Sequence, residues 1–187
     1  GHGACFHACP IEAISLRIGT EKRGVDLPHV NQNFETNIPG IYIAGELGGM
    51  GLIRNAVEQG RQAVENIVRS KRHGKKGSLD VLIVGAGPAG ISAGLMCKKS
   101  GLKFQIVDQD TLGGTVFTFP REKVIMTAPM QLPLYGKLKL HETSKEELLG
   151  IWTKILEKHQ INIHENLKVD SIIKDDEIFE VRTVSDQ

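Results

Sequence analysis

The sequence lacks the features that would place it in a membrane or outside the cell. Three cysteines are too few for the disulfide framework of a small secreted domain. The longest apolar runs, such as Val81 to Val84, are far too short to cross a bilayer. No apolar run typical of a signal peptide lies near the N-terminus. These absences predict a protein of the reducing cytoplasm.

Excess charge and several kinds of catalytic machinery are also missing. The formal net charge is only +1, which argues against nucleic acid or a membrane surface as the principal partner. There is no C-x-x-C dithiol for disulfide exchange, no second G-x-G-x-x-G and no evident Ser/His/Asp set. The seven histidines are scattered and expected on the surface. We therefore predict no catalytic side chain.

What is present falls into four expected segments. Residues 1–20 carry two cysteines, 25–69 a strand, a glycine-rich turn and a helix, 70–78 a basic linker, and 79–187 alternating strands and helices. That alternation predicts an α/β fold with a Rossmann-like, doubly wound parallel sheet. The chain begins without Met, inside what looks like a motif, and stops just after an expected strand. We therefore expect a piece of a longer protein.

Hydrophobic periodicity predicts the individual elements. In the second segment we expect a strand at 41–44 and a helix beginning near Ile53, with one apolar face: Ala56, Val57, Gly60, Ala63, Val64, Ile67 and Val68. Ser144 and Glu147 form a capping-box pair that opens a later helix, with Leu148, Ile151, Trp152, Ile155 and Leu156 as its buried stripe. The other elements expected in the last segment are strands at 79–84, 104–107 and 161–163, a helix at 91–100, and a hairpin or small meander at 167–173 and 178–184.

The clearest motif is a dinucleotide-binding turn, Gly85-Ala86-Gly87-Pro88-Ala89-Gly90, between an apolar strand and a helix. Gly85 permits the tight turn, Gly87 lets a pyrophosphate approach the backbone, and Gly90 lets strand and helix pack closely. The helix N-terminus offers free N–H groups to phosphate oxygens. Asp108, at the end of the next strand, would accept hydrogen bonds from ribose hydroxyls. The alternative is a glycine turn that opens a helix without a ligand.

A second glycine-rich motif lies at residues 36–51. It is a strand that ends in Gly45-Glu46, followed by further glycines up to Gly51 and a helix start near Ile53. A carboxylate at a strand end can bind a hydroxyl, and a helix N-terminus favours negative charge nearby. The alternative is a glycine-rich connection with no ligand.

Together with Leu112-Gly113-Gly114-Thr115, these motifs resemble the flavoproteins with two dinucleotide-binding domains, the family that includes thioredoxin reductase. Residues 115–163 look most like the bacillithiol-disulfide-reductase-type members. The resemblance implies that the turn binds FAD, that Glu46 binds the ribitol where the family usually has Asp, and that the helix start near Ile53 faces the flavin pyrimidine edge. The residues assigned to FAD in this way are Gly45, Glu46, Gly51, Ile53, Gly85, Gly87, Pro88, Ala89, Gly90, Asp108, Gln109, Gly113, Gly114 and Thr115.

The order of the two motifs departs from the family pattern. There the motif with the acid closes the FAD domain, whereas here it precedes the dinucleotide turn. Either the end of one flavoprotein module is joined to the start of another, or the FAD domain is permuted and residues 31–69 and 79–187 share one site. The basic linker is long enough for the second arrangement. The sequence does not choose between them.

The N-terminal cysteines form a third motif. Cys5 and Cys9-Pro10 resemble the last part of the bacterial ferredoxin pattern C-x₂-C-x₂-C-x₃-C-P. The resemblance implies that Cys5 and Cys9 are ligands of [4Fe–4S] clusters in a small ferredoxin-like remnant, although the segment cannot complete a four-cysteine site. The alternative is a pair of incidental cysteines. Cys97 is expected to be a buried small residue.

These observations favour part of an FAD-dependent oxidoreductase. NAD(P)H would supply electrons, and an iron–sulfur centre or a disulfide-type acceptor would receive them. The partners would then be small-molecule cofactors and a redox acceptor, with a homodimer or a larger redox complex as the assembly. Two kinds of alternative stay open. One is an FAD- or nucleotide-binding scaffold without turnover, and the other is a flavin monooxygenase or an NAD(P)-dependent dehydrogenase.

Overall fold

The computed structural model describes residues 28–48, 52–70, 77–175 and 178–185. Its elements are η1 (Glu46–Gly48), α2 (Ile53–Arg69), β1 (Val81–Val84), α3 (Pro88–Ser100), β2 (Phe104–Val107), η2 (Gly114–Val116), β3 (Ile125–Met126), β4 (Met130–Leu132), β5 (Gly136–Leu138), β6 (Glu142–Thr143), α4 (Lys145–Lys158), β7 (Ile163–His164), β8 (Leu167–Asp175) and β9 (Ile178–Ser185). None of the helices in this described part is long and apolar enough to span a bilayer.

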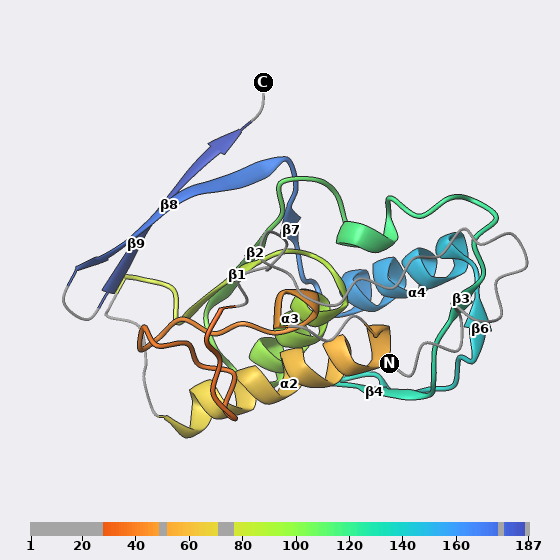
Figure 1. Cartoon of the computed structure of the whole chain (residues 1–187), viewed down its shortest axis with the longest axis horizontal. Coiled ribbons are helices and arrows are strands. Elements are labelled where there is room, and N and C mark those ends of the chain that lie inside the picture. The colour runs from red at the N-terminus through yellow and green to blue at the C-terminus, as the bar shows by residue number, and fades with distance from the viewer. Residues whose placement is uncertain (1–27, 49–51, 71–76, 176–177, 186–187) are drawn as a thin grey trace, which may run out of the picture.

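A parallel sheet of order β1-β2-β7 forms the centre of the fold (Figure 1). Helix α3 connects the first two strands of this sheet, β1 and β2, as the alternating pattern predicts. Ile83 and Ile106 are buried in the sheet, and Ile91 and Leu95 of α3 are fully buried in the same core. Within the described ranges no strand pairs with the outer side of β1. The predicted α/β class with a parallel, Rossmann-like sheet is therefore confirmed.

Helix α2 packs along α3 (Figure 1). Gly60 makes this approach possible, because a Cβ at that position would overlap the carbonyl oxygen of Ala89. The buried face of α2 ends at Val64. Val68 is exposed, so the prediction that the apolar stripe continues to the end of the helix is wrong for this residue. The last turn of α2 lies beyond the part of the helix that is buried.

The predicted strand at 41–44 is also not formed as a strand. Only Tyr42 makes a β-bridge, to Glu35, and the N–H of Ile43 donates to the carbonyl of Phe34 at 2.9 Å. The segment folds back on its own loop instead of joining the central sheet, which explains why periodicity alone misassigned it.

The excursion between β2 and β7 contains two small antiparallel pairs, β3 with β6 and β4 with β5, and then helix α4. The Ser144 hydroxyl accepts the N–H of Glu147 at 3.1 Å, so the predicted cap is confirmed. The predicted stripe of α4 is buried except for Ile151, which is half-buried.

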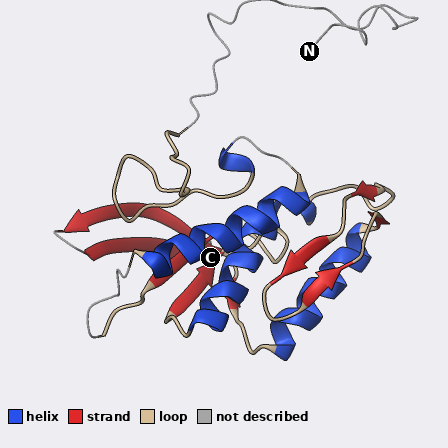
Figure 2. Ribbon diagram, turned by 90° about the horizontal axis from the view of Figure 1, so that it is seen from below, coloured by secondary structure: helices blue, strands red, loops and turns tan. Residues whose placement is uncertain are grey.

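The last two strands form the predicted hairpin, with β8 antiparallel to β9 and an irregularity between Val169 and Ser171. The hairpin extends beyond the helices in both views (Figures 1 and 2). It is anchored to the N-terminal part of the chain by the ring of Phe179, which lies against Gly40.

Candidate functional site

The turn between β1 and α3 has the backbone that its glycines predict. Gly85 has a φ of +108°, which favours glycine, and its N–H donates to the carbonyl of Val107 at 2.8 Å. A Cβ at Gly90 would overlap the carbonyl oxygen of Gly85. The turn therefore cannot form in this way with a larger residue at position 90.

The N-terminus of α3 is free to bind an anion. Its N-cap is Gly87, Pro88 follows, and no side chain caps the helix or places a carboxylate in the first turn. The first backbone hydrogen bond of the helix runs from Ile91 to the carbonyl of Gly87 at 2.9 Å. The N–H groups of Ala89 and Gly90 precede that bond and have no intrahelical acceptor. They are donors of the kind that phosphate oxygens accept.

There is also room for a ligand beside this turn. A Cβ at Gly85 would meet nothing within 4 Å, and one at Gly87 would meet only the carbonyl oxygen of Gly113 at 4.0 Å. The absence of side chains at these two positions thus leaves open space next to the first helical amides. The residues present fit a pyrophosphate group at this position.

The glycine pair after β2 crosses directly over the turn. The N–H of Gly113 donates to the carbonyl of Ala86 at 3.0 Å, and a Cβ on Gly114 would lie 3.4 Å from the Cα of Gly87. Both glycines have positive φ, +106° and +52°. The side chain of Leu149 in α4 packs against Gly113 and supports the position of this glycine pair. Two motifs that are separate in the sequence therefore meet at one place.

Asp108 at the end of β2 is buried, with 6% of its surface exposed. Its carboxylate accepts the N–H of Ala86 at 2.5 Å and the N–H of Asp110 at 2.8 Å. The carboxylate thus fixes the dinucleotide turn against the end of the second strand. Each carboxylate oxygen can accept more than one hydrogen bond, so the predicted contact with a ribose stays a prediction. Gln109, the next residue, is exposed, and so is Thr115 after the glycine pair.

The earlier motif lies beside the same helix start. A Cβ on Gly45 would be 3.1 Å from the Cβ of Ala89, in the first turn of α3. The N–H of Gly45 donates to the side chain of Gln59 at 2.7 Å, which ties the motif to α2. Glu46 is exposed at the start of η1, and α2 begins at Ile53 without a side-chain cap.

Three predicted site residues, Cys5, Cys9 and Gly51, lie outside the described residues. Among the residues that are described, no group of three or more His, Cys, Asp or Glu side chains could hold a metal ion. Cys97 is fully buried in α3, as predicted. Burial and the nearby charge of Asp80 raise the pKa of the Cys97 thiol to about 12, so it is protonated at neutral pH.

Sequence reasoning assigned Gly60 only to an apolar face and missed its contact with Ala89. A glycine inside an otherwise regular helix was the available signal, because such a residue is unfavourable unless packing requires it. The contribution of Gln59 had no comparable signal.

Comparison with known proteins is consistent with this geometry. The profile of a protein family described as pyridine nucleotide-disulphide oxidoreductase matches residues 82–187. The thioredoxin reductase of Mycoplasma pneumoniae is 40% identical over 65 residues, which cover 32% of this chain and 21% of the relative. The ferredoxin–NADP reductase of Rickettsia conorii is 31% identical over 107 residues, which cover 56% of this chain and 28% of the relative.

Among solved structures, the bacillithiol disulfide reductase of Staphylococcus aureus has a similar fold. Its TM-score is 0.51 at 18% identity, and the match covers 56% of this chain and 33% of that protein. The chain thus spans about a third or less of the length of the proteins it matches.

Proposed function

The chain belongs to the pyridine nucleotide-disulphide oxidoreductase family, and on that basis we propose that it forms part of an FAD-dependent enzyme. In this proposal the enzyme takes electrons from NADH or NADPH and passes them to an iron–sulfur centre or a disulfide-type acceptor. The names of two relatives, a thioredoxin reductase and a ferredoxin–NADP reductase, support both kinds of acceptor. To this chain we assign the binding of FAD.

The observation that carries the assignment is the crossing of Gly113 and Gly114 over Ala86 and Gly87 at an uncapped helix start. A glycine turn that merely opens a helix has no need of a second glycine pair above it. Here the turn after β1 and the glycine pair after β2 both lack the side chains that would fill the space between these two segments. That combination favours an extended ligand with a phosphate group at the helix and a further part along residues 113–115.

In the proposed complex the N–H groups of Ala89 and Gly90 donate to the pyrophosphate, and the partial positive charge of the α3 N-terminus stabilises it. Pro88 fixes the φ angle of the first helical residue, and the N–H group that proline lacks would have had no partner within the helix. Asp108 holds Ala86 in place, and with Gln109 it lies where the adenosine ribose would be. When bound, FAD supplies the ability to accept a hydride and release electrons singly.

The same proposal assigns Gly45 and Glu46 to the ribitol and the start of α2 at Ile53 to the flavin pyrimidine edge. Partial positive charge there would stabilise negative charge on that edge. The contacts of Gly45 and Gly60 with Ala89 support one FAD site built by residues 31–69 and 79–187 together. They favour the permuted arrangement over two unrelated modules.

The test is to titrate the purified chain and two matched glycine variants with FAD. Binding is measured by the quenching of flavin fluorescence. Gly87→Ala fits the fold, since Gly87 has an extended backbone and its Cβ would meet no atom closer than 4.0 Å. It would place a methyl group in the proposed phosphate site. Gly150→Ala, in α4 with open space around it, is the control.

We expect Gly87→Ala to weaken FAD binding by at least about tenfold, a loss of about 1.4 kcal/mol, with an unchanged circular dichroism spectrum. Gly150→Ala should bind like the original chain. Equal affinity in all three proteins would refute the assignment of FAD to this turn.

A further inference from the structure

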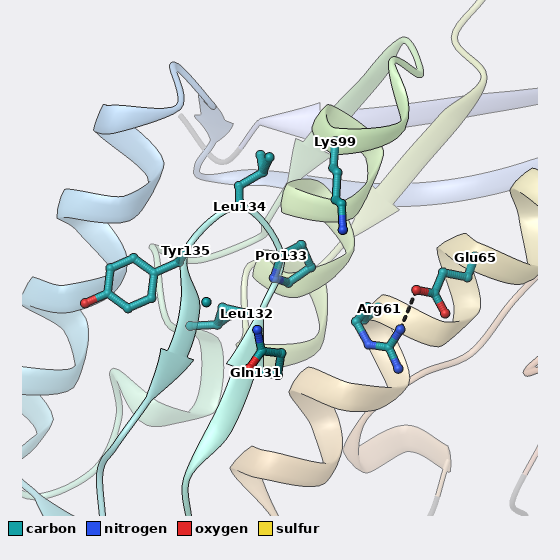
Figure 3. A pocket seen from close by; sticks show the side chains of 9 residues that line it. Arg61, Glu65, Lys99, Gln131, Leu132, Pro133, Leu134 and Tyr135 are labelled. Carbon is teal, nitrogen blue, oxygen red and sulfur yellow. Dashed lines mark hydrogen bonds and ion pairs between the residues drawn. The ribbon is translucent and has the colours of Figure 1, made fainter.

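A groove between α2 and the β4–β5 hairpin lies apart from the dinucleotide turn of the proposed FAD site. Two hollows of about 480 and 540 Å³ are each bounded by α2 and the β4–β5 hairpin, and Gln131 of β4 lines both. We name this surface the α2–hairpin groove. Figure 3 shows the first hollow, where Lys99 reaches from α3 toward Pro133 and Arg61 turns toward Glu65 on α2. No residue of the dinucleotide turn or of the Gly113–Thr115 segment lines either hollow.

The two acidic side chains of the groove share one arginine as their ion-pair partner. Arg61 forms ion pairs with both Glu58 and Glu65 on its own helix. The hydrogen bond from Arg61 lowers the pKa of Glu58, and the same bond raises the pKa of Arg61. One cation facing two carboxylates leaves this cluster with a net charge of about −1, which the three further cations of the groove outweigh.

The cations around the cluster are not paired in this way. Arg54 and Lys137 line the second hollow and Lys99 lines the first, and within the described ranges none of them forms an ion pair. Arg54 nevertheless lies close enough to Glu58 for its charge to help lower the pKa of that carboxyl group. Lys99 and Lys137 are exposed. The three come from α2, α3 and β5, so the positive charge follows the groove and does not belong to one element. A ligand that lies along it would meet positive charge on each side of the hairpin.

The tip of the hairpin adds apolar surface. Leu134 is 39% exposed and Tyr135 is 45% exposed. Leu134 also has a φ of +63°, which is costly for a residue with a branched side chain. In Figure 3 Leu134 and Tyr135 project from the turn and are not folded against the core. Exposed aromatic and aliphatic side chains beside arginine and lysine are typical of protein interfaces.

We propose that the α2–hairpin groove docks an acidic segment of a partner protein. Its carboxylates would pair with Arg54, Lys99 and Lys137, and an apolar side chain would rest on Leu134 and Tyr135. The exposed apolar tip favours protein over nucleic acid. At one end the groove is far from the dinucleotide turn, because Lys99 lies about 18 Å from Gly87 along the axis of α3. At the other end Arg54 follows Ile53 of the proposed FAD site, so the test changes Lys99 and Lys137 and leaves Arg54 unchanged.

The test uses the whole chain and a short fluorescein-labelled peptide rich in glutamate around one leucine and one phenylalanine. Binding is followed by fluorescence anisotropy at low and at physiological salt. The groove variant is Lys99→Glu with Lys137→Glu. The matched control is Lys154→Glu with Lys158→Glu, which makes the same charge change at two lysines of α4 that line neither hollow. A third variant, Tyr135→Ser, removes apolar surface without changing charge.

We expect the groove variant to bind the peptide at least about fivefold more weakly than the control variant, since opposed charges across an interface govern association. Tyr135→Ser should weaken binding with little change in its salt dependence. Equal loss in the groove and control variants would overturn the proposal, since only net charge would then matter. Tighter binding of single-stranded DNA or of anionic phosphatidylserine vesicles than of the peptide would also overturn it, in favour of those ligands. Circular dichroism of each variant verifies the fold, and FAD titration of the same variants separates failure of docking from failure of the FAD site.

Discussion

Helices α3 and α4 begin in opposite ways, although both pack against the same core. The start of α4 is complete in itself. Ser144 caps the amide of Glu147, and Glu146 and Glu147 place carboxylates in the first turn. The start of α3 has glycine at the N-cap, proline next, and no acidic side chain. One helix satisfies its own first amides, while the other leaves them available.

The difference shows how the fold separates stability from binding. Glu147 also accepts a hydrogen bond from the hydroxyl of Thr143 at 2.7 Å, so the α4 terminus is fixed by three neighbouring side chains. At α3 the equivalent restraint comes from backbone packing, through Gly60 of α2 and the glycine pair after β2. The effect of an added side chain in either helix is therefore expected to depend on the space around that position.

The largest expected effect on the free energy of unfolding is at Gly90. Gly90→Ala would push a Cβ into the carbonyl oxygen of Gly85, so strand and helix would have to separate. We expect a loss of about 3 kcal/mol, at the upper end for overpacking, measured by urea denaturation of the chain without cofactor. An unchanged midpoint would show that the turn is looser than its geometry indicates.

A smaller loss is expected where α4 depends on its cap. Ser144→Ala removes the acceptor for the Glu147 amide and should destabilise the chain by about 1 kcal/mol in the same assay. Ser144→Asp, which retains a capping oxygen, serves as the control and should lose much less. If both variants lost the same amount, the cap would not be the cause.

Gly150→Ala should change stability in the other direction. Gly150 lies inside α4, and a Cβ there would meet nothing within 4 Å. Alanine is favoured over glycine in a helix interior, so we expect a gain of about 0.5–1 kcal/mol in thermal or urea unfolding. If Gly150→Ala lowered the free energy of unfolding as Gly90→Ala does, the contacts around each glycine would not explain either result.

The smallest expected effect comes from giving α3 the cap that it lacks. The backbone at Gly87 is extended, as an N-cap requires, and has room for a side chain. Gly87→Asp should raise the stability of the cofactor-free chain by a few tenths of a kcal/mol, because aspartate caps slightly better than glycine. Differential scanning fluorimetry compares the melting temperatures of this variant and the original chain and is sensitive enough to detect the difference. A marked destabilisation would indicate that the space beside the turn is already filled.

The sequence predicted those parts of the fold that depend on local pattern. The unit β1-α3-β2 was predicted with its turn, because apolar runs and glycine positions specify it within about 30 residues. The hydrogen bond that caps α4 at Ser144 was predicted, because a capping box is read from residues three apart. The other half of the box differs, since the Glu147 carboxylate accepts the hydroxyl of Thr143. The hairpin of β8 and β9 was also predicted, from two apolar runs with a charged turn between them.

The rest depends on contacts between distant segments. Residues 41–44 have the composition of a strand, but a strand needs a partner, and no local feature shows that the chain pairs back to Glu35. The hydrogen bond from Gly113 to Ala86 and the contact of Gly60 with Ala89 join segments that periodicity treats separately. The α2–hairpin groove combines residues from α2, α3 and the β4–β5 turn, so no linear motif indicates it.

The outer side of β1 has a consequence for how the isolated chain behaves in solution. Val81 and Gly85 donate their N–H groups to the carbonyls of Lys103 and Val107, so the alternate amides at Leu82 and Val84 face away from the sheet. In the part of the chain that the structure describes, no strand pairs with β1 on that side. Val84 is 58% exposed there. Such an edge is a template for self-association through added strands, and concentrated preparations are expected to aggregate. A lysine at position 84 would act as a gatekeeper against it, so Val84→Lys is the first change to make for solubility.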